Sequence, residues 1–228
     1  MAGVLYIVAT PIGNLNDITR RAIETLGAVD LILCEDTRTS QKLLAHFGIE
    51  KPLQSYHQHS ALQKTESIIA ALKEGKNIAL VSDAGTPGIS DPGNQLVAAL
   101  TVLGQDIKIV PLPGANAAIA ALSVSGFPTD KFVFLGFPPV KNKRQKYFEE
   151  LLACEYAAVF YESNFRILKT LAEIDALNPD KGRRALVCRE LTKMFETVYR
   201  GTVSEVAEKI KKDPLKGEFV AVFEGKRG

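Results

Sequence analysis

The chain reads VLYIVATPIGNL over residues 4–15, an uncharged and largely apolar run that ends in a loop containing proline and glycine. Its first part, residues 4–9, predicts a strand buried on both faces. The same pattern of short apolar strands and helical stretches continues along the first half of the chain. The expected strands are 31–33, 78–81 and 107–110, and the expected helices are 17–27, 39–47, 61–74 and 93–103. This alternation predicts a mostly parallel sheet with helices packed against it.

A second series of helices and strands follows the pair Pro138-Pro139. Its expected helices are 142–152, 165–177 and 202–212, and its expected strands are 157–161, 185–188, 196–199 and 219–224. Gly126, Pro128 and Gly136 interrupt regular structure just before that pair, which is typical of a domain boundary. We therefore expect two α/β domains, residues 1–127 and residues 128–228.

The composition excludes several classes of protein. The 228 residues carry 28 lysines and arginines against 26 acidic residues, so any nucleic-acid site must be a local basic patch. Cys34, Cys154 and Cys188 lack the paired spacing of a zinc site, and we expect buried thiols in a reducing compartment and no metal. No apolar run reaches the ~20 residues of a membrane span, and no charged leader opens the chain. These features predict a cytoplasmic protein.

Three loops rich in glycine and proline follow expected strands directly, at residues 9–15, 82–93 and 111–116. In open parallel sheets, ligands bind in the crevice beyond the carboxyl ends of the strands. None of the loops is a phosphate-binding GxxxxGK[ST] run or a GxGxxG run, which disfavours a nucleoside triphosphate or a classical dinucleotide. The position of the loops therefore predicts a ligand site of another kind.

The loop at 82–93 combines two carboxylates, Asp83 and Asp91, with hydroxyls and glycines, and such a loop can wrap a polar ligand. Asp91 followed by Pro92 is also typical of an ordinary helix start, whereas Asp83 has no such explanation. The small side chains after Pro113 would let a flat ring or a neighbouring backbone come close. Both interpretations of these small residues stay open.

Long motifs in this chain resemble the ribosomal RNA small subunit methyltransferase I family. They cover the chain nearly end to end and in order: LYIVATPIGNL and DIT within residues 5–19, EDTR at 35–38, LVSDAGTP at 80–87, VPLPG at 110–114, FYES at 160–163 with Arg166, RELTK at 189–193 and GEF at 217–219.

The resemblance implies the tetrapyrrole methylase fold, also called the class III methyltransferase fold, with a mostly parallel sheet in the first domain and a mixed sheet in the second. It implies S-adenosylmethionine as the cofactor, held in the cleft between the domains, and a homodimer. The implied reaction is 2′-O-methylation of a cytidine in small-subunit (16S) ribosomal RNA. The implied partner is that RNA or the assembled 30S subunit, with neither DNA nor a membrane involved.

Carried over motif by motif, the resemblance also implies cofactor contacts in both domains. They are Pro11, Asp83, Ala84, Gly85, Thr86, Pro87, Ser90, Asp91, Pro113, Gly114 and Ala115 in the first domain, and Tyr161, Ser163 and Leu191 in the second. Carboxylates suit this task because they accept strong hydrogen bonds from ribose hydroxyls or from an ammonium group.

A ribose hydroxyl must lose its proton during methyl transfer, so the reaction needs a proton acceptor or a field that favours the alkoxide. We expect Asp36 or Glu35 to accept the proton, and Arg38 to orient a phosphate or pair with one of these acids. Asp36 could instead only cap a helix. We expect Lys193 to stabilise the alkoxide, or to act as a base if burial lowers its pKa, with a solvated surface lysine as the alternative.

Two basic segments are candidates for contacts with RNA phosphates, residues 141–147 and the pair Arg183-Arg184, with solvated helix faces as the alternative. Many relatives continue past the last strand, whereas this chain stops at residues 225–228, a difference that bears on substrate capture. Two other functions compete. One is a methyltransferase of the same fold that acts on a tetrapyrrole or another small molecule. This function is disfavoured because residues 9–15 lack the glycine-rich GxGxGD-type first loop of the tetrapyrrole enzymes. The other is a non-catalytic RNA-binding assembly factor, which would not bind the cofactor.

Overall fold

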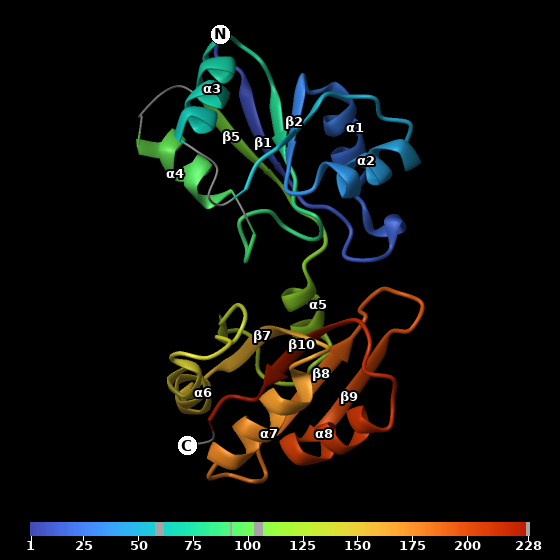
Figure 1. Ribbon diagram of the computed structural model, residues 1–228, viewed down its shortest axis with the longest axis vertical. Helices are drawn as coiled ribbons and strands as arrows, with labels where there is room; N and C mark the ends of the chain where they lie inside the picture. Colours follow the sequence, from blue (N-terminus) through green and yellow to red (C-terminus); the bar gives the residue numbers. More distant parts are fainter. Residues whose placement is uncertain (58–61, 92, 103–106, 227–228) are drawn as a thin grey trace. The chain divides into compact units, whose positions relative to one another are not determined.

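The chain divides into two compact units, Met1–Asn116 and Ala117–Gly228. The computed structural model describes residues 1–57, 62–91, 93–102 and 107–226 (Figure 1).

The first unit is built on a five-stranded sheet in the order β3-β2-β4-β1-β5, in which every neighbouring pair is parallel. The strands are β1 (Val4–Val8), β2 (Leu31–Cys34), β3 (Leu53–Ser55), β4 (Ile78–Leu80) and β5 (Lys108–Leu112). The helices are α1 (Arg20–Ala28), α2 (Thr37–His46), α3 (Leu62–Lys73) and α4 (Asn94–Val102), with a short 3₁₀ helix η1 (Leu15–Asp17).

Helices cover both faces of this sheet, with α1 and α2 on one side and α3 and α4 on the other (Figure 1). Alternate strand residues enter the two cores: Ile78 and Leu80 pack with the residues of α3 and α4, whereas Ala79 packs with those of α1 and α2. Apart from Lys108 at the start of β5, these strands carry no charged residue, because most of their side chains are buried or half-buried between the two helix layers. The neighbouring strands β1 and β4 thus lead to helices on opposite faces, the arrangement that opens a ligand crevice at the edge of such sheets.

The second unit contains a mixed sheet in the order β6-β7-β10-β8-β9. Only β6 and β7 are parallel, and the other pairs are antiparallel. Its strands are β6 (Phe132–Phe134), β7 (Ala157–Ser163), β8 (Arg184–Arg189), β9 (Thr197–Thr202) and β10 (Glu218–Phe223). Its helices are α5 (Ala117–Ser123), α6 (Arg144–Ala153), α7 (Ile167–Leu177) and α8 (Val203–Lys211). The expected fold class, a mostly parallel sheet followed by a mixed one, is confirmed.

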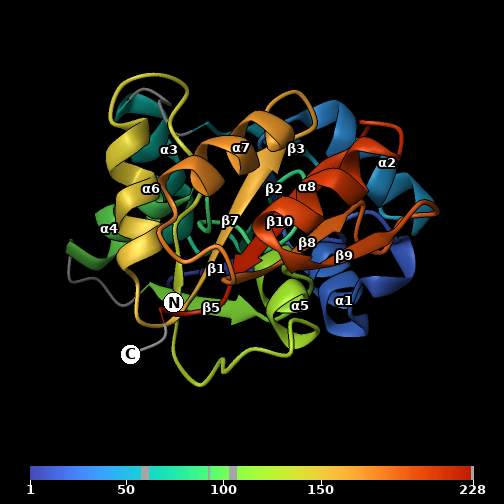
Figure 2. The same cartoon turned by 90° about the horizontal axis from the view of Figure 1, so that it is seen from below.

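Helices α6, α7 and α8 share one core of the second unit, and α7 and α8 lie side by side over its sheet (Figure 2). Helix α5 packs with the other core, in which Ala118, Ala121 and Leu122 meet the opposite faces of β7, β8 and β10. The sequence places the boundary after residue 127, at the glycines and prolines, whereas the compact units divide before α5. The difference arises because the small apolar side chains of α5 are buried against the second sheet.

Some boundaries differ from those expected. Strands β3 and β6 are additional, and the expected helix 17–27 is divided into η1 and α1, because the Ala22 N–H donates to Thr19 Oγ1 (3.1 Å) and α1 begins there. Ala61 and Leu103, the expected ends of two helices, lie outside the described residues. In the described part of the chain, no helix is both long and apolar enough to cross a membrane.

Helix α8 begins with a complete capping box. The Glu205 N–H donates to Thr202 Oγ1 (3.4 Å), and the Thr202 N–H donates to Glu205 Oε2 (2.9 Å). We expect Thr202→Ala to lower the free energy of unfolding by about 1 kcal/mol, because it leaves a helix-start amide without a partner. Urea denaturation measures the change, and Thr202→Ser, which keeps the hydroxyl, is the control. Equal stability of the two variants would contradict a role for this cap.

Candidate active site

The loops after β1, β4 and β5 form one connected layer at the carboxyl edge of the first sheet. Thr10 and Gly85 pair through both backbone groups, at 2.9 and 3.0 Å, and the Thr10 hydroxyl donates to the Ser82 carbonyl (3.1 Å). The Thr86 hydroxyl donates to the Ala115 carbonyl (3.2 Å). Each of these bonds joins two loops that are distant in the sequence, and together they connect all three loops.

Two glycines make this close approach possible. A Cβ atom on Gly114 would lie 2.8 Å from the Cβ of Ala9, so the loop after β5 can touch the loop after β1 only without a side chain. Gly85 has φ +82°, in the left-handed region that other residues rarely adopt. The close packing expected from small side chains is therefore present between these loops, and it leaves Gly114 exposed.

The loop after β2 joins the same layer through Asp83. The Asp36 N–H donates to Asp83 Oδ1 (3.0 Å). Asp36 is also the N-cap of α2, and its Oδ1 accepts from the Arg38 N–H (2.8 Å), while the Arg38 guanidinium donates to both of its oxygens. Hydrogen bonds from Arg38 lower the pKa of Asp36 to about 2. Both alternatives from the sequence hold here: Asp36 caps a helix, and Arg38 pairs with it.

Glu35 and Asp91 lie at the same edge, but their pKa values are raised, whereas that of Asp36 is lowered. Burial raises the pKa of Glu35, and the charge of Asp83 raises it further, although His57 acts in the opposite direction. Burial likewise raises the pKa of Asp91 to about 6, against a hydrogen bond from Ser82 that lowers it. Among the described residues, the Glu35 carboxylate has no hydrogen-bond partner. It is therefore a half-buried acid whose oxygens are available to a ligand.

The raised pKa of Asp91 predicts a pH-dependent stability. Because its pKa is higher in the folded chain than the ordinary 3.8, folding favours the protonated form. This contribution is complete below pH 3.8 and is lost as the pH rises through about 6. We expect Asp91→Asn to be more stable than the wild type above pH 6 and to lose that advantage at lower pH. Urea denaturation on both sides of pH 6 tests this, and a constant difference would contradict it. Pro92 lies outside the described residues, so the helix-start interpretation stays a prediction.

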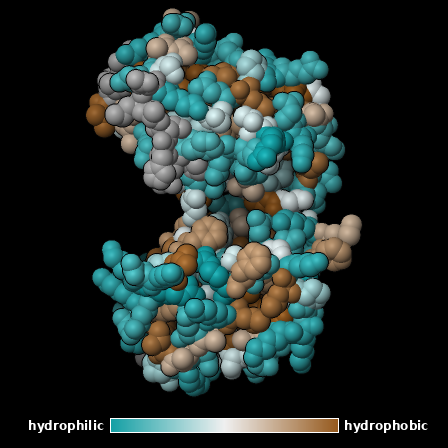
Figure 3. Space-filling model, in the orientation of Figure 1, coloured by the Kyte–Doolittle hydropathy of each residue, from teal (hydrophilic) through white to brown (hydrophobic). Residues whose placement is uncertain are grey.

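The candidate residues of the second unit lie at one edge of its sheet, where β7 and β8 end and β10 begins. Tyr161 packs edge-on against Phe134 and Phe137, with ring centroids 5.0 and 5.5 Å away, and its hydroxyl accepts from the Ala118 N–H (3.3 Å). Ser163 is the last residue of β7, and Leu191 follows β8 and packs with the core that α5 covers. Hydrophobic side chains also appear among hydrophilic ones on the visible surface of this unit (Figure 3).

Lys193 lies between two carboxylates of the second unit. Its Nζ donates to Glu190 Oε1 (2.8 Å) and to Glu218 Oε2 (2.9 Å). Burial acts against its charge, but these hydrogen bonds outweigh that effect and raise the pKa of Lys193. The expectation that burial lowers this pKa and makes Lys193 a base is wrong. The alternative, a freely solvated surface lysine, is also wrong, because the ammonium group is held by two carboxylates. Lys193 is a fixed cation.

Two arginines in the expected basic clusters are not available to RNA. Arg144 is 7% exposed and donates to Glu173, Thr170 and the Pro139 carbonyl. Arg183 is 4% exposed and donates to backbone carbonyls, including that of Glu224. Both guanidinium groups are used inside the fold. The exposed cations of the first cluster are Lys141, Lys143 and Lys146.

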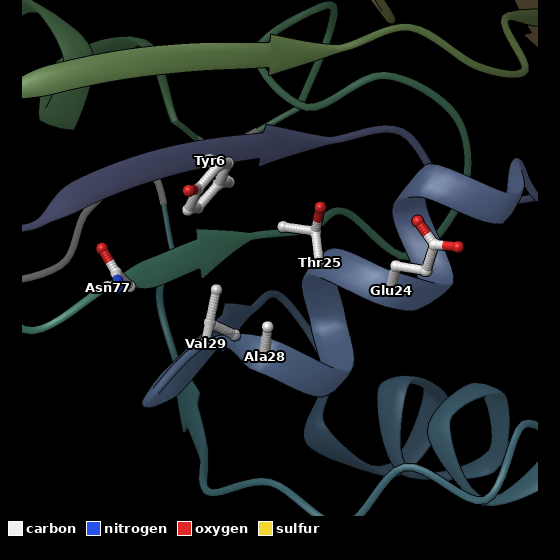
Figure 4. Close-up of a pocket in the computed structure, with 6 residues that line it drawn as sticks. All are labelled: Tyr6, Glu24, Thr25, Ala28, Val29 and Asn77. Carbon is white, nitrogen blue, oxygen red and sulfur yellow. The ribbon is translucent and has the colours of Figure 1, made fainter.

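A small pocket elsewhere on the first unit contains none of the candidate residues. It has a volume of about 210 Å³ and lies between β1 and α1 (Figure 4). Its lining residues are Tyr6, Glu24, Thr25, Ala28, Val29 and Asn77. The candidate site is therefore the loop layer, not this pocket.

Comparisons with known proteins agree with this geometry. The family of tetrapyrrole (corrin/porphyrin) methylases matches residues 4–207. The ribosomal RNA small subunit methyltransferase I of Haemophilus influenzae is 48% identical over 99% of this chain and 80% of its own length. The protein of the same name from Synechocystis is 49% identical over 98% of this chain and 79% of its own length.

The chain belongs to the ribosomal RNA small subunit methyltransferase I family. This family lies within the tetrapyrrole methylases. The protein is thus a methyltransferase whose cofactor is S-adenosylmethionine. Solved structures support the fold: the methyltransferase CobJ superposes with a TM-score of 0.71 at 19% identity, over 100% of this chain and 97% of that one. A cobalt precorrin-4 methyltransferase gives 0.68 at 18% identity, over 96% and 94%.

The residues of the loop layer fit this cofactor chemically. Asp83 uses one carboxylate oxygen for the Asp36 amide, and its Oδ2 has no partner among the described residues. A carboxylate with one oxygen still available can accept hydrogen bonds from ribose hydroxyls or from an ammonium group. Ala84 and Gly114 are exposed and offer backbone without bulky side chains. These properties match a ligand that combines a flat ring, a ribose and an amino acid.

The motif FYES contains a further residue of chemical interest, Glu162. Its side chain is 0% exposed in the second unit, although its residue type alone predicts a surface position. The available signal was a charged residue inside an apolar strand, since such residues are buried only when they are paired.

The remaining candidates of the first unit belong to the loops of the loop layer. Pro11 and Pro87 are buried, Ser90 has φ +64°, and Pro113 is exposed.

Proposed function

We propose that this methyltransferase methylates the 2′-hydroxyl of a cytidine in small-subunit ribosomal RNA. The names of its relatives, at 47–49% identity over nearly the whole chain, support the RNA as substrate. The observation that carries the chemistry is Glu35, a half-buried carboxylate beside the loop layer that accepts no hydrogen bond from the residues that the structure describes. A ribose hydroxyl needs such a proton acceptor, whereas a stronger nucleophile would not.

The loop layer holds the cofactor in this proposal. Asp83 and Asp91 accept hydrogen bonds from its polar groups, and the exposed backbone around Gly114 lies against it. The cofactor supplies an activated methyl group on a sulfonium. The enzyme gains most by aligning the hydroxyl with that methyl at near-attack distance, ~3 to 3.5 Å. The wider cofactor set is the one implied by the motifs, with Tyr161, Ser163 and Leu191 as its members in the second unit.

The acids next to the cofactor have separate tasks. Asp36 is used by the start of α2 and by Arg38, and its low pKa makes it a weak base. Glu35 has a raised pKa and, within the described part of the chain, no hydrogen bond to its oxygens, and it takes the proton from the ribose hydroxyl. Arg38 remains exposed and can approach a phosphate of the RNA. Lys193 stays charged and stabilises negative charge that develops on the substrate.

The partners follow from the same proposal. The substrate is free small-subunit RNA or the assembled 30S subunit, and the enzyme is a cytoplasmic homodimer. The buried thiols of Cys34 and Cys188 accord with a reducing compartment. Lys141, Lys143 and Lys146 are the exposed cations that we assign to RNA phosphates.

Transfer of labelled methyl groups from S-adenosylmethionine tests the proposal. Purified enzyme is incubated with small subunits from a strain that lacks it, with the extracted RNA, and with a tetrapyrrole. We expect label in one or both RNA samples and none in the tetrapyrrole. Label in the tetrapyrrole alone would move the assignment to a small-molecule enzyme. Cofactor binding without any transfer to RNA would favour a non-catalytic assembly factor.

A further inference from the structure

The Glu162 carboxylate is the centre of a buried polar network in the second unit. Its Oε1 accepts from the Ser163 N–H (2.7 Å) and from Arg166 Nη2 (2.8 Å), and its Oε2 accepts from the Thr170 hydroxyl (2.7 Å). The carboxylate is fully buried on β7. Because an unpaired buried charge is very unfavourable, these bonds offset the cost of burying the carboxylate on β7.

Two arginines extend the network to the segment 136–139. Arg166 Nη1 donates to the Pro138 carbonyl (3.2 Å), and Arg144 Nη1 donates to the Pro139 carbonyl (2.9 Å). Arg144 is linked to Glu162 through Thr170, whose hydroxyl oxygen accepts from Arg144 Nη2 (2.6 Å). Prolines have no N–H to anchor their segment, so the arginines provide fixed partners for it.

The segments that this network holds are next to each other at the edge of the sheet. The Tyr161 N–H donates to the Gly136 carbonyl (2.9 Å), and the Phe137 ring packs against the ring of Tyr161. Tyr161 and Ser163 are also the residues assigned to the cofactor in the proposed function. The network therefore fixes the Ser163 amide on β7 and the neighbouring segment 136–139.

Stability alone explains this network poorly. A buried ion pair contributes little net stability, and apolar residues of similar volume are often as good or better. In this network, by contrast, the hydrogen bonds end on backbone groups of one amide and two carbonyls at the edge of the sheet. Such bonds set the position of a backbone, which is what a ligand contact through backbone requires.

We infer that Glu162 is a positioning residue for the cofactor: through Arg166, Thr170 and Arg144 it holds the Tyr161–Ser163 backbone and the 136–139 segment in the conformation that binds S-adenosylmethionine. This inference rests on the proposed function for the contact of Tyr161 and Ser163 with the cofactor. Glu162 itself touches neither the cofactor nor the RNA.

The test compares full-length variants by two measurements that need no turnover. The first is the calorimetric Kd for S-adenosylmethionine, and the second is the hydrogen-exchange rate of the Ser163 amide in the cofactor-free protein. Glu162→Gln keeps the shape and removes the charge. We expect its Kd to rise on the order of 10- to 100-fold, by analogy with the loss of groups that orient the ligands of a metal ion, and its Ser163 amide to exchange faster. Arg166→Ala should act alike, and Arg166→Lys should recover part of the affinity.

Arg183→Gln is the matched control. Arg183 is also buried and also donates to backbone carbonyls, those of Leu152 (2.6 Å) and Glu224 (2.8 Å), but it lies at the opposite edge of the sheet, before β8 begins. We expect it to lower the melting temperature and to leave the Kd unchanged. Should Glu162→Gln not fold, Thr170→Val removes only the bridging hydroxyl and is expected to weaken binding less strongly.

Two outcomes separate this inference from the proposed function. A Kd that is unchanged in folded Glu162→Gln or Thr170→Val, while the wild type methylates RNA, overturns the inference and leaves the function in place. A raised Kd in these variants but not in Arg183→Gln, from a wild type that methylates no RNA, supports the inference and rejects the function. Equal changes of Kd in Arg183→Gln and Glu162→Gln would also overturn the inference, because the effect would then follow stability alone.

Discussion

Glu35→Gln is expected to lower kcat for RNA methylation on the order of 10²- to 10⁴-fold, the usual contribution of a positioned proton acceptor. The amide keeps the size of the side chain but cannot take the ribose proton. The Kd for S-adenosylmethionine should stay the same, because Asp83 and the loop layer are unchanged. Rapid-quench measurement of a single turnover, with saturating cofactor, separates this loss from changes in binding.

The pH dependence of kcat in the wild type tests the role of Glu35 independently. Activity requires the ionised form, so kcat should fall as the pH drops through the pKa of Glu35. That fall should come at a higher pH than for an ordinary glutamate, because burial and the charge of Asp83 raise this pKa. In Glu35→Gln the fall should disappear from the residual rate.

Asp36→Asn is the matched control for that prediction. Asp36 caps α2 and pairs with Arg38, and asparagine also caps helices, so this variant should lose little stability and show a much smaller fall in kcat. A greater loss of kcat in Asp36→Asn than in Glu35→Gln would reverse the roles of the two acids.

Gly114→Val is expected to weaken cofactor binding strongly. A Cβ at this position would lie 2.8 Å from the Cβ of Ala9, so the loops after β1 and β5 must move apart. Overpacking of this kind typically costs ~1 to 3 kcal/mol, which corresponds to an increase in Kd of about 5- to 150-fold if the loops separate at the site. Calorimetric titration with S-adenosylmethionine measures the change.

Gly27→Ala is the control for this effect of added bulk. Gly27 lies in α1, and a Cβ there meets no atom within 4 Å, so alanine should leave the Kd unchanged and favour the helix slightly. A Kd in Gly114→Val equal to that of the wild type would remove the loop after β5 from the cofactor site.

The parallel sheet of the first unit could be predicted because its strands are buried on both faces. Residues such as Ile78, Ala79 and Leu80 form a run without charge, and their loops end at the same edge as the motifs indicate. The strands β3 (Leu53–Ser55) and β6 (Phe132–Phe134) were missed. Each has three residues at the margin of its sheet, which is too short for an apolar pattern to stand out.

The charges of the site were harder to predict than its place. The sequence shows that Glu35 and Asp36 are adjacent, but not that the start of α2 uses the Asp36 carboxylate while the Glu35 carboxylate accepts no hydrogen bond from the described residues. Arg144 and Arg183 occur in basic clusters, yet both are buried because they bind groups from distant parts of the chain, the Thr170 and Glu173 side chains for Arg144 and the Glu224 carbonyl for Arg183. Long-range hydrogen bonds of this kind leave no local pattern.

The most direct test of the central claim is the chemical identity of the methylated nucleoside. Small subunits from a strain without the enzyme are treated with the purified protein and S-adenosylmethionine, and the RNA is digested to nucleosides for mass spectrometry. We predict 2′-O-methylcytidine as the new product, absent when Glu35→Gln replaces the wild type. A methyl group on a base, or no new nucleoside from a protein that binds the cofactor, would contradict a ribose methyltransferase with Glu35 as its proton acceptor.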